Sequence, residues 1–353
     1  MIYINGTASI SPQPTFEKKG FLKEIVEYTT NRFQCIEPDY EKFLSPNELR
    51  RLSRVLKLGW GAAKSCLDDA FVSTPGAIIT GTGCGCYHET QKFIFSMYEN
   101  DETLLSPTPF IQSSHGSIAA QIAMMTGCSD YNMTYAHRGF SFESALMDAL
   151  MLMGEKHLKS VLVGGVDEIG ERQFITFNRI GYWKTKAINN LKLLESDSAG
   201  TIAGEGSSFF LLQDFSGPET YARIRAVHVF SNLSGTVDVE NEIRKFVKRQ
   251  EITVNDIDWV FLGLNGDKQF DPLYYHLMST VFKNNGLACY KHLCGEYHTS
   301  TAFALWLAAK ILKEQTFPSI LKLNNPENKT VGNILIYNHY RNINHSLILV
   351  SAR

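Results

Sequence analysis

The sequence predicts an α/β fold, because short apolar runs alternate along the chain with segments of helical periodicity. The runs are apolar at almost every position, which is typical of strands covered by helices on both faces of a sheet. A chain of 353 residues is also long enough to bury a large core. The strand candidates are Gly76–Gly81, Ser160–Gly165, Ser207–Leu212, Trp259–Leu264, Gly332–Tyr337 and Ser346–Val350.

Three segments have a clear helical pattern. The first is predicted to run from Ser45 to Ala70, since Ser45 can cap a helix and Pro46 suits its first turn. Its apolar residues recur at helical spacing, which predicts one buried stripe. The stripe consists of Leu52, Val55, Leu56, Trp60 and Ala63. The other two helices are predicted over Phe142–Met153 and Thr301–Leu312.

The order of elements repeats between the two halves of the chain. In the first half a strand ends in a Gly-rich turn, a polar turn with His137 opens the helix, and two strands follow. In the second half a strand ends at Asn265, a polar turn with Glu296 opens the helix, and two strands close the chain. This matching order indicates an internal duplication.

Composition and charge argue against several classes of function. The chain has 34 Lys and Arg against 36 Asp and Glu, without runs of one sign, so we expect no nucleic-acid or anionic-membrane surface. No apolar stretch approaches the ~20 residues of a membrane span, and the N-terminus lacks a signal-peptide pattern. Seven cysteines without a CxxC pair do not indicate a zinc or thioredoxin-like site. We therefore expect a cytoplasmic protein with reduced thiols.

Four motif-bearing segments occur in a specific order. They are Leu52–Ala70 (LSRVLKLGWGAAKSCLDDA), Gly81–Gly85 (GTGCG), Val163–Glu168 (VGGVDE) and Ala199–Leu212 (AGTIAGEGSSFFLL). Each motif is weak alone, since Gly-x-Gly patterns occur in unrelated turns. In this order they resemble the early helix, the turn after the next strand, the Gly-Gly segment and the Gly-Glu-Gly loop of the β-ketoacyl synthase family. The resemblance implies a thiolase-like, five-layered αβαβα fold made of two duplicated halves, here 1–215 and 216–353.

The family's chemistry needs a cysteine and two histidines. The cysteine lies at a helix N-terminus and takes an acyl chain from a carrier protein as a thioester. The histidines promote decarboxylation of a malonyl unit and hold the developing enolate oxygen. In this chain His137 occupies the cysteine position, in Thr134–Phe142 (TYAHRGFSF), Asn265 the first histidine position and Glu296, in KHLCGE, the second.

Each of these three changes opposes condensation. An imidazole is a poor store for an acyl chain, an amide cannot shuttle a proton, and a carboxylate would place negative charge beside an enolate. The pattern resembles the chain-length-factor class. These inactive subunits pair with a true ketosynthase in aromatic polyketide and in aryl polyene or flexirubin-type pathways. The resemblance implies a heterodimer with a catalytic ketosynthase subunit, an acyl carrier protein as a further partner, and no cofactor.

In this family the dimer interface surrounds the nucleophile strand and the segment before it. The segment Thr108–His115 is therefore predicted to shape an acyl tunnel or the interface. The candidates are Phe110, Gln112, His115 and Arg138. Phe110 is the best candidate for a residue that forms the tunnel wall. The alternative, to which we give equal weight, is that its ring packs in the core. For Arg138 the plainer expectation is an ion pair with Glu143 or Glu296.

Two other functions remain open at this stage. One is an active acyltransferase or condensing enzyme that uses His137, Cys294 or Glu296 in a rearranged site. The other is a homodimeric acyl-binding protein. For His137 we favour a hydrogen-bonded structural residue that fills a former active-site pocket, and for Cys294 a buried small hydrophobe. A metal site of His137, Glu296 and His298 is disfavoured, because the sequence offers no fourth ligand.

Overall fold

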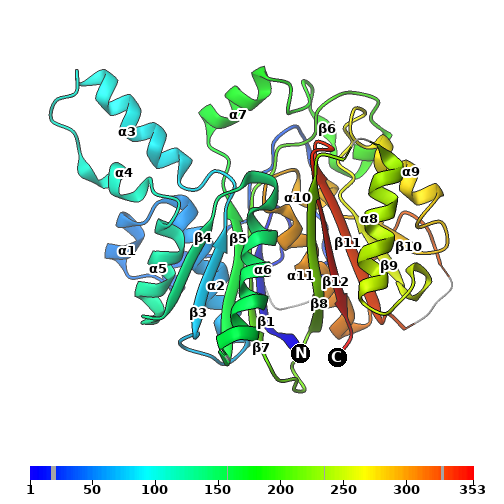
Figure 1. The fold of residues 1–353 in the computed structure, drawn as a ribbon. Coiled ribbons are helices and arrows are strands. Elements are labelled where there is room, and N and C mark those ends of the chain that lie inside the picture. Colours follow the sequence, from blue (N-terminus) through cyan, green and yellow to red (C-terminus); the bar gives the residue numbers. More distant parts are fainter. Residues whose placement is uncertain (17–20, 157, 234, 327–329) are drawn as a thin grey trace.

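The computed structural model describes residues 1–16, 21–156, 158–233, 235–326 and 330–353. Its centre is a ten-stranded sheet, and N and C lie close together at one end of it (Figure 1). The strands are β1 (Ile2–Ile10), β3 (Ala77–Gly81), β4 (Tyr131–Tyr135), β5 (Ser160–Asp167), β7 (Gly206–Gln213), β8 (Ala222–Ser231), β9 (Trp259–Leu262), β10 (Gly286–Cys289), β11 (Asn333–Tyr340) and β12 (Asn344–Ser351). A separate small sheet pairs β2 (Thr29–Thr30) with β6 (Ile188–Asn189).

Helices cover this sheet on its faces and at one edge. They are α1 (Pro46–Arg51), α2 (Arg54–Asp69), α3 (Tyr87–Glu99), α4 (Pro107–Gln112), α5 (Ser117–Thr126), α6 (Ser141–Lys156), α7 (Glu171–Arg179), α8 (Thr236–Arg249), α9 (Pro272–Ser279), α10 (Lys291–Cys294) and α11 (Ser300–Glu314). Among the described residues, no helix is long and apolar enough to span a membrane.

The two halves of the sheet have the same strand order. The first half runs β4-β3-β5-β7-β1 and the second β10-β9-β11-β12-β8. In each half the first three strands are parallel and the last two pairings are antiparallel. An antiparallel pairing of β1 with β8 joins the halves into one sheet. The division that we propose at 215/216 falls in the connection between β7 and β8.

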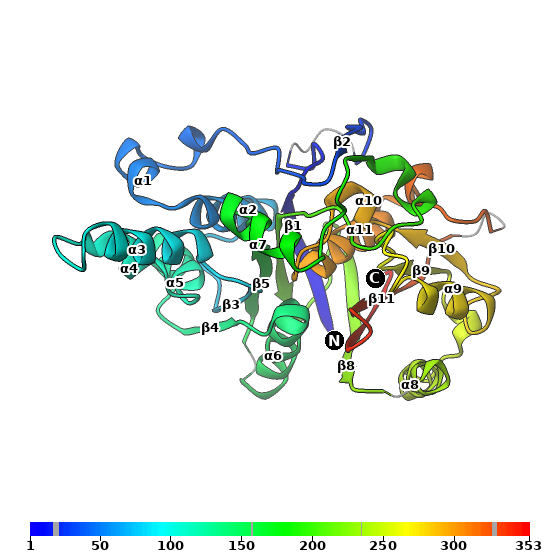
Figure 2. The ribbon, with the colours of Figure 1, turned by 90° about the horizontal axis from the view of Figure 1, so that it is seen from above.

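The molecule has five layers, which can be followed from left to right in Figure 2. The first core lies between α2 and α5 and the strands of the first half. The second core surrounds α6 and α11, which lie between the strands of the two halves. The third core lies between the strands of the second half and α8 and α9. The thiolase-like α/β architecture is thus confirmed.

The inner strands β5 and β9 are almost entirely apolar because each of them contributes to two cores. In β5, Val161 and Val163 face the central helices, whereas Leu162 faces α2. In β9, Phe261 faces the central helices and Val260 faces the outer layer. Alternate side chains of a strand point to opposite faces, so both faces require apolar residues here. All six predicted strands are confirmed, with ends that differ by a few residues.

The prediction of one helix from Ser45 to Ala70 is wrong. Ser45 does cap α1, in a reciprocal capping box with Glu48. The chain then leaves the helical conformation at Leu52 (φ −78°, ψ 131°). A new helix, α2, begins after Ser53, which is extended. The apolar spacing continues across the break because Leu52 and α2 contribute to the same core, so periodicity alone could not reveal it.

Buried histidines predict that the protein loses stability in acid. Burial lowers the pKa of His292 and of His345 to about 4, from an ordinary value near 6.5. Between these values the unfolded chain binds more protons than the folded chain, so stability present above pH 6.5 is lost as the pH falls towards 4. We expect a loss of ~2 kcal/mol per histidine in the free energy of unfolding at pH 5.

Urea titrations at pH 7.5 and pH 5 measure this loss. The variant His345→Gln should lose less stability on acidification than the wild type does. His137→Gln is the control for the replacement of a histidine, because this side chain is exposed. Equal pH dependence in all three proteins would contradict the assignment.

Candidate functional site

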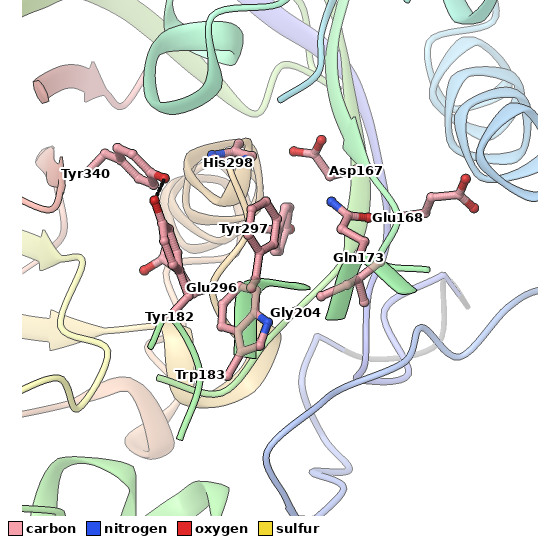
Figure 3. A pocket seen from close by; sticks show the side chains of 12 residues that line it. Asp167, Glu168, Gln173, Tyr182, Trp183, Gly204, Glu296, Tyr297, His298 and Tyr340 are labelled. Carbon is pink, nitrogen blue, oxygen red and sulfur yellow. Dashed lines mark hydrogen bonds between the residues drawn. The ribbon is translucent and has the colours of Figure 1, made fainter. Parts of the chain in front are cut away.

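A small cavity lies where β5, α7, β11 and the turn before α11 meet (Figure 3). Its volume is about 40 Å³, which is room for only a few water molecules. Aromatic rings form much of its wall. They belong to Phe177, Tyr182, Trp183, Tyr297, His298 and Tyr340. The hydroxyl of Tyr340 donates to that of Tyr182 at 3.3 Å, as the dashed line in Figure 3 marks.

The side chains of Asn265 and Glu296 meet beside this cavity. The Asn265 amide nitrogen donates to Glu296 Oε2 at 2.6 Å. The ammonium group of Lys291, which is fully buried, donates to the same oxygen at 2.6 Å. The carboxylate is thus held between an amide and a cation, and its position is fixed.

Several hydrogen bonds fix the loop that carries Asn265. The Asp271 carboxylate accepts from the backbone N–H of Asn265 at 3.2 Å and of Gly266 at 2.8 Å. Burial raises the pKa of Asp271 to about 6, and these two hydrogen bonds oppose the shift. On the other side the buried ammonium group of Lys184 donates to the Gly266 carbonyl at 2.8 Å. Asn265 Oδ1 accepts from the Asp267 N–H, so both ends of its side chain are engaged.

Asp167, at the end of β5, connects this region to the Gly-rich turn after β3. One of its oxygens accepts from the hydroxyl of Thr82 and the backbone N–H groups of Gly83 and Cys84. The other accepts from the backbone and the hydroxyl of Thr299, at 3.0 and 2.9 Å, immediately before α11. The carboxylate is 4% exposed and thus joins two turns that are far apart in the sequence.

Two glycines let the backbones of the two halves touch beside the cavity. Gly204 donates its N–H to the Glu296 carbonyl at 2.9 Å, and the Glu296 N–H donates to Ile202 at 2.9 Å. A Cβ at Gly204 would lie 2.1 Å from the Cys294 carbonyl oxygen. Gly295 has φ +73° and its Cα faces Gly204. Larger residues at either position would push the two turns apart.

The family model for the N-terminal domain of β-ketoacyl synthases matches residues 9–216. This match covers more than half of the chain. The chain belongs to the β-ketoacyl synthase family. No curated protein sequence matches it significantly.

Solved structures of ketosynthases have the same fold. A ketosynthase/chain length factor for ishigamide superposes with a TM-score of 0.79 at 14% identity. A β-ketoacyl synthase from Burkholderia phymatum gives 0.77 at 14%. A type II polyketide synthase acyl-carrier protein in complex with its ketosynthase gives 0.77 at 12%. In all three the match covers 100% of this chain and 99% of the other.

In this ketosynthase-family chain, His137 does not fill the pocket, and that expectation is wrong. Its side chain is exposed and stacks on Phe140, with ring centroids 5.3 Å apart. It does not line the cavity. Its backbone N–H donates to the hydroxyl of Ser141 at 2.9 Å, and its carbonyl accepts from the Phe140 N–H at 3.4 Å. The residue directly precedes a 3-10 turn, Arg138–Phe140, that leads into α6.

Arg138 makes no ion pair with any described residue, contrary to expectation. Glu143 instead accepts from Ser346 at 2.9 Å, and Glu296 is already held by Lys291. Arg138 has a left-handed backbone, with φ +49°, which is uncommon for a residue with a long side chain. Within the described ranges no three His, Cys, Asp or Glu side chains are arranged to hold a metal ion.

The tunnel candidates lie away from the cavity in this family member. Phe110 and Gln112 belong to α4, which projects with α3 at the upper left of Figure 1. Phe110 is 60% exposed and packs on Phe93, with centroids 5.1 Å apart. Gln112 donates to the Arg51 carbonyl at 2.5 Å, and the exposed His115 packs on Gly85. None of these residues lines the cavity.

Several residues of the site had no distinct signal in the sequence. Tyr182, Trp183 and Tyr340 stand outside the four motifs, and an aromatic residue in a loop is not by itself a functional signal. Asp167 lies inside VGGVDE, but only the contact with Thr299 reveals its role. The available clue was an acid two residues after the Gly-Gly pair of an otherwise apolar run.

Removal of one partner of the Lys291–Glu296 ion pair is predicted to cause a large loss of stability. Glu296→Ala would leave the buried Lys291 ammonium group without its carboxylate, and we expect the free energy of unfolding to fall by about 3 kcal/mol. The double variant Glu296→Ala/Lys291→Met should recover most of this loss, because no buried charge remains. Lys64→Ala, which breaks the half-exposed Lys64–Asp68 pair, should cost less than about 1 kcal/mol. Chemical denaturation of the four proteins measures these values, and an equal loss in the single and the double variant would refute the argument.

Proposed function

We propose that this chain is a non-catalytic, chain-length-factor-like subunit that pairs with a catalytic ketosynthase in polyketide-type biosynthesis. The observation that carries the proposal is the Lys291–Glu296–Asn265 group. At the two positions where the family has histidines, this chain has an amide bonded to a carboxylate. The carboxylate is in turn neutralised by a buried lysine.

This group does not suit decarboxylation or condensation. A developing enolate needs hydrogen-bond donors at its oxygen. Glu296 offers a carboxylate, and the donors of Asn265 and Lys291 are already directed at that carboxylate. The cavity beside it, at about 40 Å³, also has no room for an acyl chain.

The contacts weigh against the alternative of a rearranged enzyme. Burial raises the pKa of the Cys294 thiol well above its ordinary range, and this thiol is fully enclosed. A protonated, inaccessible thiol is a poor nucleophile. His137 is accessible, but no carboxylate of a described residue is hydrogen-bonded to its ring, as the orientation of a general base requires.

The surface near α3, α4 and β4 supports a partner interface. β4 is an edge strand of the sheet, and its Met133 is 40% exposed. The projecting helices add exposed Ile94, Phe110 and Ile111. Monomers rarely leave so much apolar surface next to an unpaired strand edge.

The solved relatives are consistent with this pairing. One of them is a ketosynthase/chain length factor and another a carrier protein in complex with its ketosynthase. By analogy, we propose a ketosynthase and a carrier protein as the partners of this chain, in the cytoplasm. Because Phe110 is exposed here, it would line an acyl tunnel only together with the partner subunit.

The first test is the intact mass of the purified chain after incubation with acyl-thioester donors. We expect no acyl adduct and no β-ketoacyl product with malonyl-carrier protein, because no competent nucleophile or oxyanion site is present. Addition of a ketosynthase with an intact Cys-His-His set from the same pathway should restore condensation. An adduct on His137 or Cys294 of the chain alone would overturn the proposal in favour of a new active site.

A second test addresses the interface. Phe110→Asp and Met133→Asp should each weaken association with the ketosynthase at least about tenfold, since each buries a charge in an apolar contact. Val237→Asp is the matched control, because Val237 is 64% exposed on the distant α8. Sedimentation or calorimetry of the purified pair measures the affinity. A weakening by the α8 variant equal to that of the other two would argue against this surface.

A further inference from the structure

The small cavity at the site has a wall of aromatic rings that contact one another. The Phe177 ring stacks on that of Tyr182, with centroids 5.1 Å apart, and meets Trp183 edge-on at 5.9 Å. The hydroxyl contact continues the wall from Tyr182 to Tyr340, whose ring centroid lies 5.2 Å from that of His298. All five residues line the cavity (Figure 3). They form a continuous aromatic surface beside a space of about 40 Å³.

Carboxyl groups, and not cations, accompany these rings. Asp167, Glu168 and Glu296 line the cavity, whereas no lysine or arginine of the described ranges does. The charge of Glu296 is balanced by Lys291. Asp167 is 4% exposed, and its hydrogen-bond donors among the described residues are all neutral. The cavity therefore has a buried negative charge beside it that no neighbouring cation neutralises.

The Asp167 carboxylate lies beside the end of the aromatic wall formed by His298. Its oxygens accept from the backbone N–H groups of Gly83 and Thr299, at 2.8 and 3.0 Å. His298 directly precedes Thr299, and its ring fills the space that a Cβ of Gly83 would need. The carboxylate and the ring are thus held by the same two turns. The carboxyl group of Glu168, in contrast, is turned away from His298 in Figure 3.

His298 does not itself supply the missing cation. Burial lowers the pKa of its imidazole below the ordinary value near 6.5, although the charges of Asp167 and Glu296 oppose this shift. The ring is therefore neutral at pH 8. Its Nδ1 has no hydrogen-bond partner among the described residues. In the tautomer with the proton on Nε2, this atom can accept a hydrogen bond from a bound donor.

We propose that this cavity binds a small ammonium ion, either free ammonium or a primary alkylammonium of one or two carbons. Aromatic rings attract a cation over their faces through the ring quadrupole, and the attraction grows when water is excluded. The Asp167 carboxylate adds a full negative charge, and His298 Nδ1 offers an acceptor for an N–H group. A metal ion suits the site less well, because both Asp167 oxygens already accept hydrogen bonds.

The size of the cavity limits the ligand. Its volume of about 40 Å³ is only slightly more than the ~30 Å³ that one water molecule occupies in the liquid. Ammonium and methylammonium fit such a space, whereas tetramethylammonium, with four methyl groups around the nitrogen, does not. The site belongs to the isolated chain, and its existence does not depend on the proposed partner.

Calorimetric titration of the full-length chain with methylammonium chloride at pH 8 tests the site. We expect saturable binding with a dissociation constant on the order of 1 to 10 mM. Methanol is the neutral isostere, potassium chloride controls for ionic strength and tetramethylammonium chloride for size, and none of them should bind in this range. N-acetyl-lysine methylamide presents the same ammonium group on a long stem. Binding as tight as that of methylammonium would identify the ligand as the end of a longer molecule, and weaker binding would identify it as a free ion.

Two variants of one wall residue test the role of the rings. Tyr340→Leu removes a ring and should weaken methylammonium binding about fivefold. Tyr340→Phe is the matched control, because it keeps the ring and loses only the hydroxyl, and its affinity should stay within about twofold of the wild type. If Tyr340→Leu fails to fold, Phe177→Leu removes a ring from the opposite end of the wall and should have the same effect.

Any of three results would overturn the ammonium site. The first is the absence of saturable methylammonium binding by the wild-type chain. The second is binding of methanol, potassium or tetramethylammonium that is as tight as that of methylammonium. The third is an affinity of the folded Tyr340→Leu or Phe177→Leu variant that equals that of the wild type.

Discussion

The carboxylate of Asp167 accepts hydrogen bonds from both halves of the molecule, and the site depends on this junction. It fixes the Gly-rich turn at Gly83 and the start of α11 at Thr299. A buried carboxylate is stable only when donors surround it, so these two turns must keep their positions. The turn with Glu296 and His298 lies directly before α11. Its geometry therefore follows from a residue of the opposite half.

A second buried acid, Glu205, plays the corresponding role towards the N-terminal segments. It takes two donors from Arg54 and one N–H each from Cys35 and Ile169. Together with the close approach of Gly204 to Gly295, these contacts preserve the ketosynthase scaffold. The scaffold does not require a reactive cysteine or histidine. The fold can therefore persist whichever residues stand at the three reactive positions.

The assignment of Asn265 and Glu296 to the family's histidine positions stays a prediction. Each of them stands beside a glycine of the scaffold, and the structure brings them into contact. Sequence reasoning failed for His137 and Arg138, which lie in a short irregular turn before α6. There a rotation of one residue decides whether a side chain enters the cavity or solvent. Hydrophobic periodicity contains no information on such a rotation.

The sequence by itself determined the α/β class, the six apolar strands, the helices around which the halves pack, and the order of motifs that indicates the family. These features follow from local patterns, because burial on both faces of a strand requires apolar residues at every position. Only the tertiary structure decided the strand order, the small size of the cavity, and the pairing of Lys291 with Glu296. Such contacts join residues through space, and their energies depend on burial and distance that no local pattern specifies.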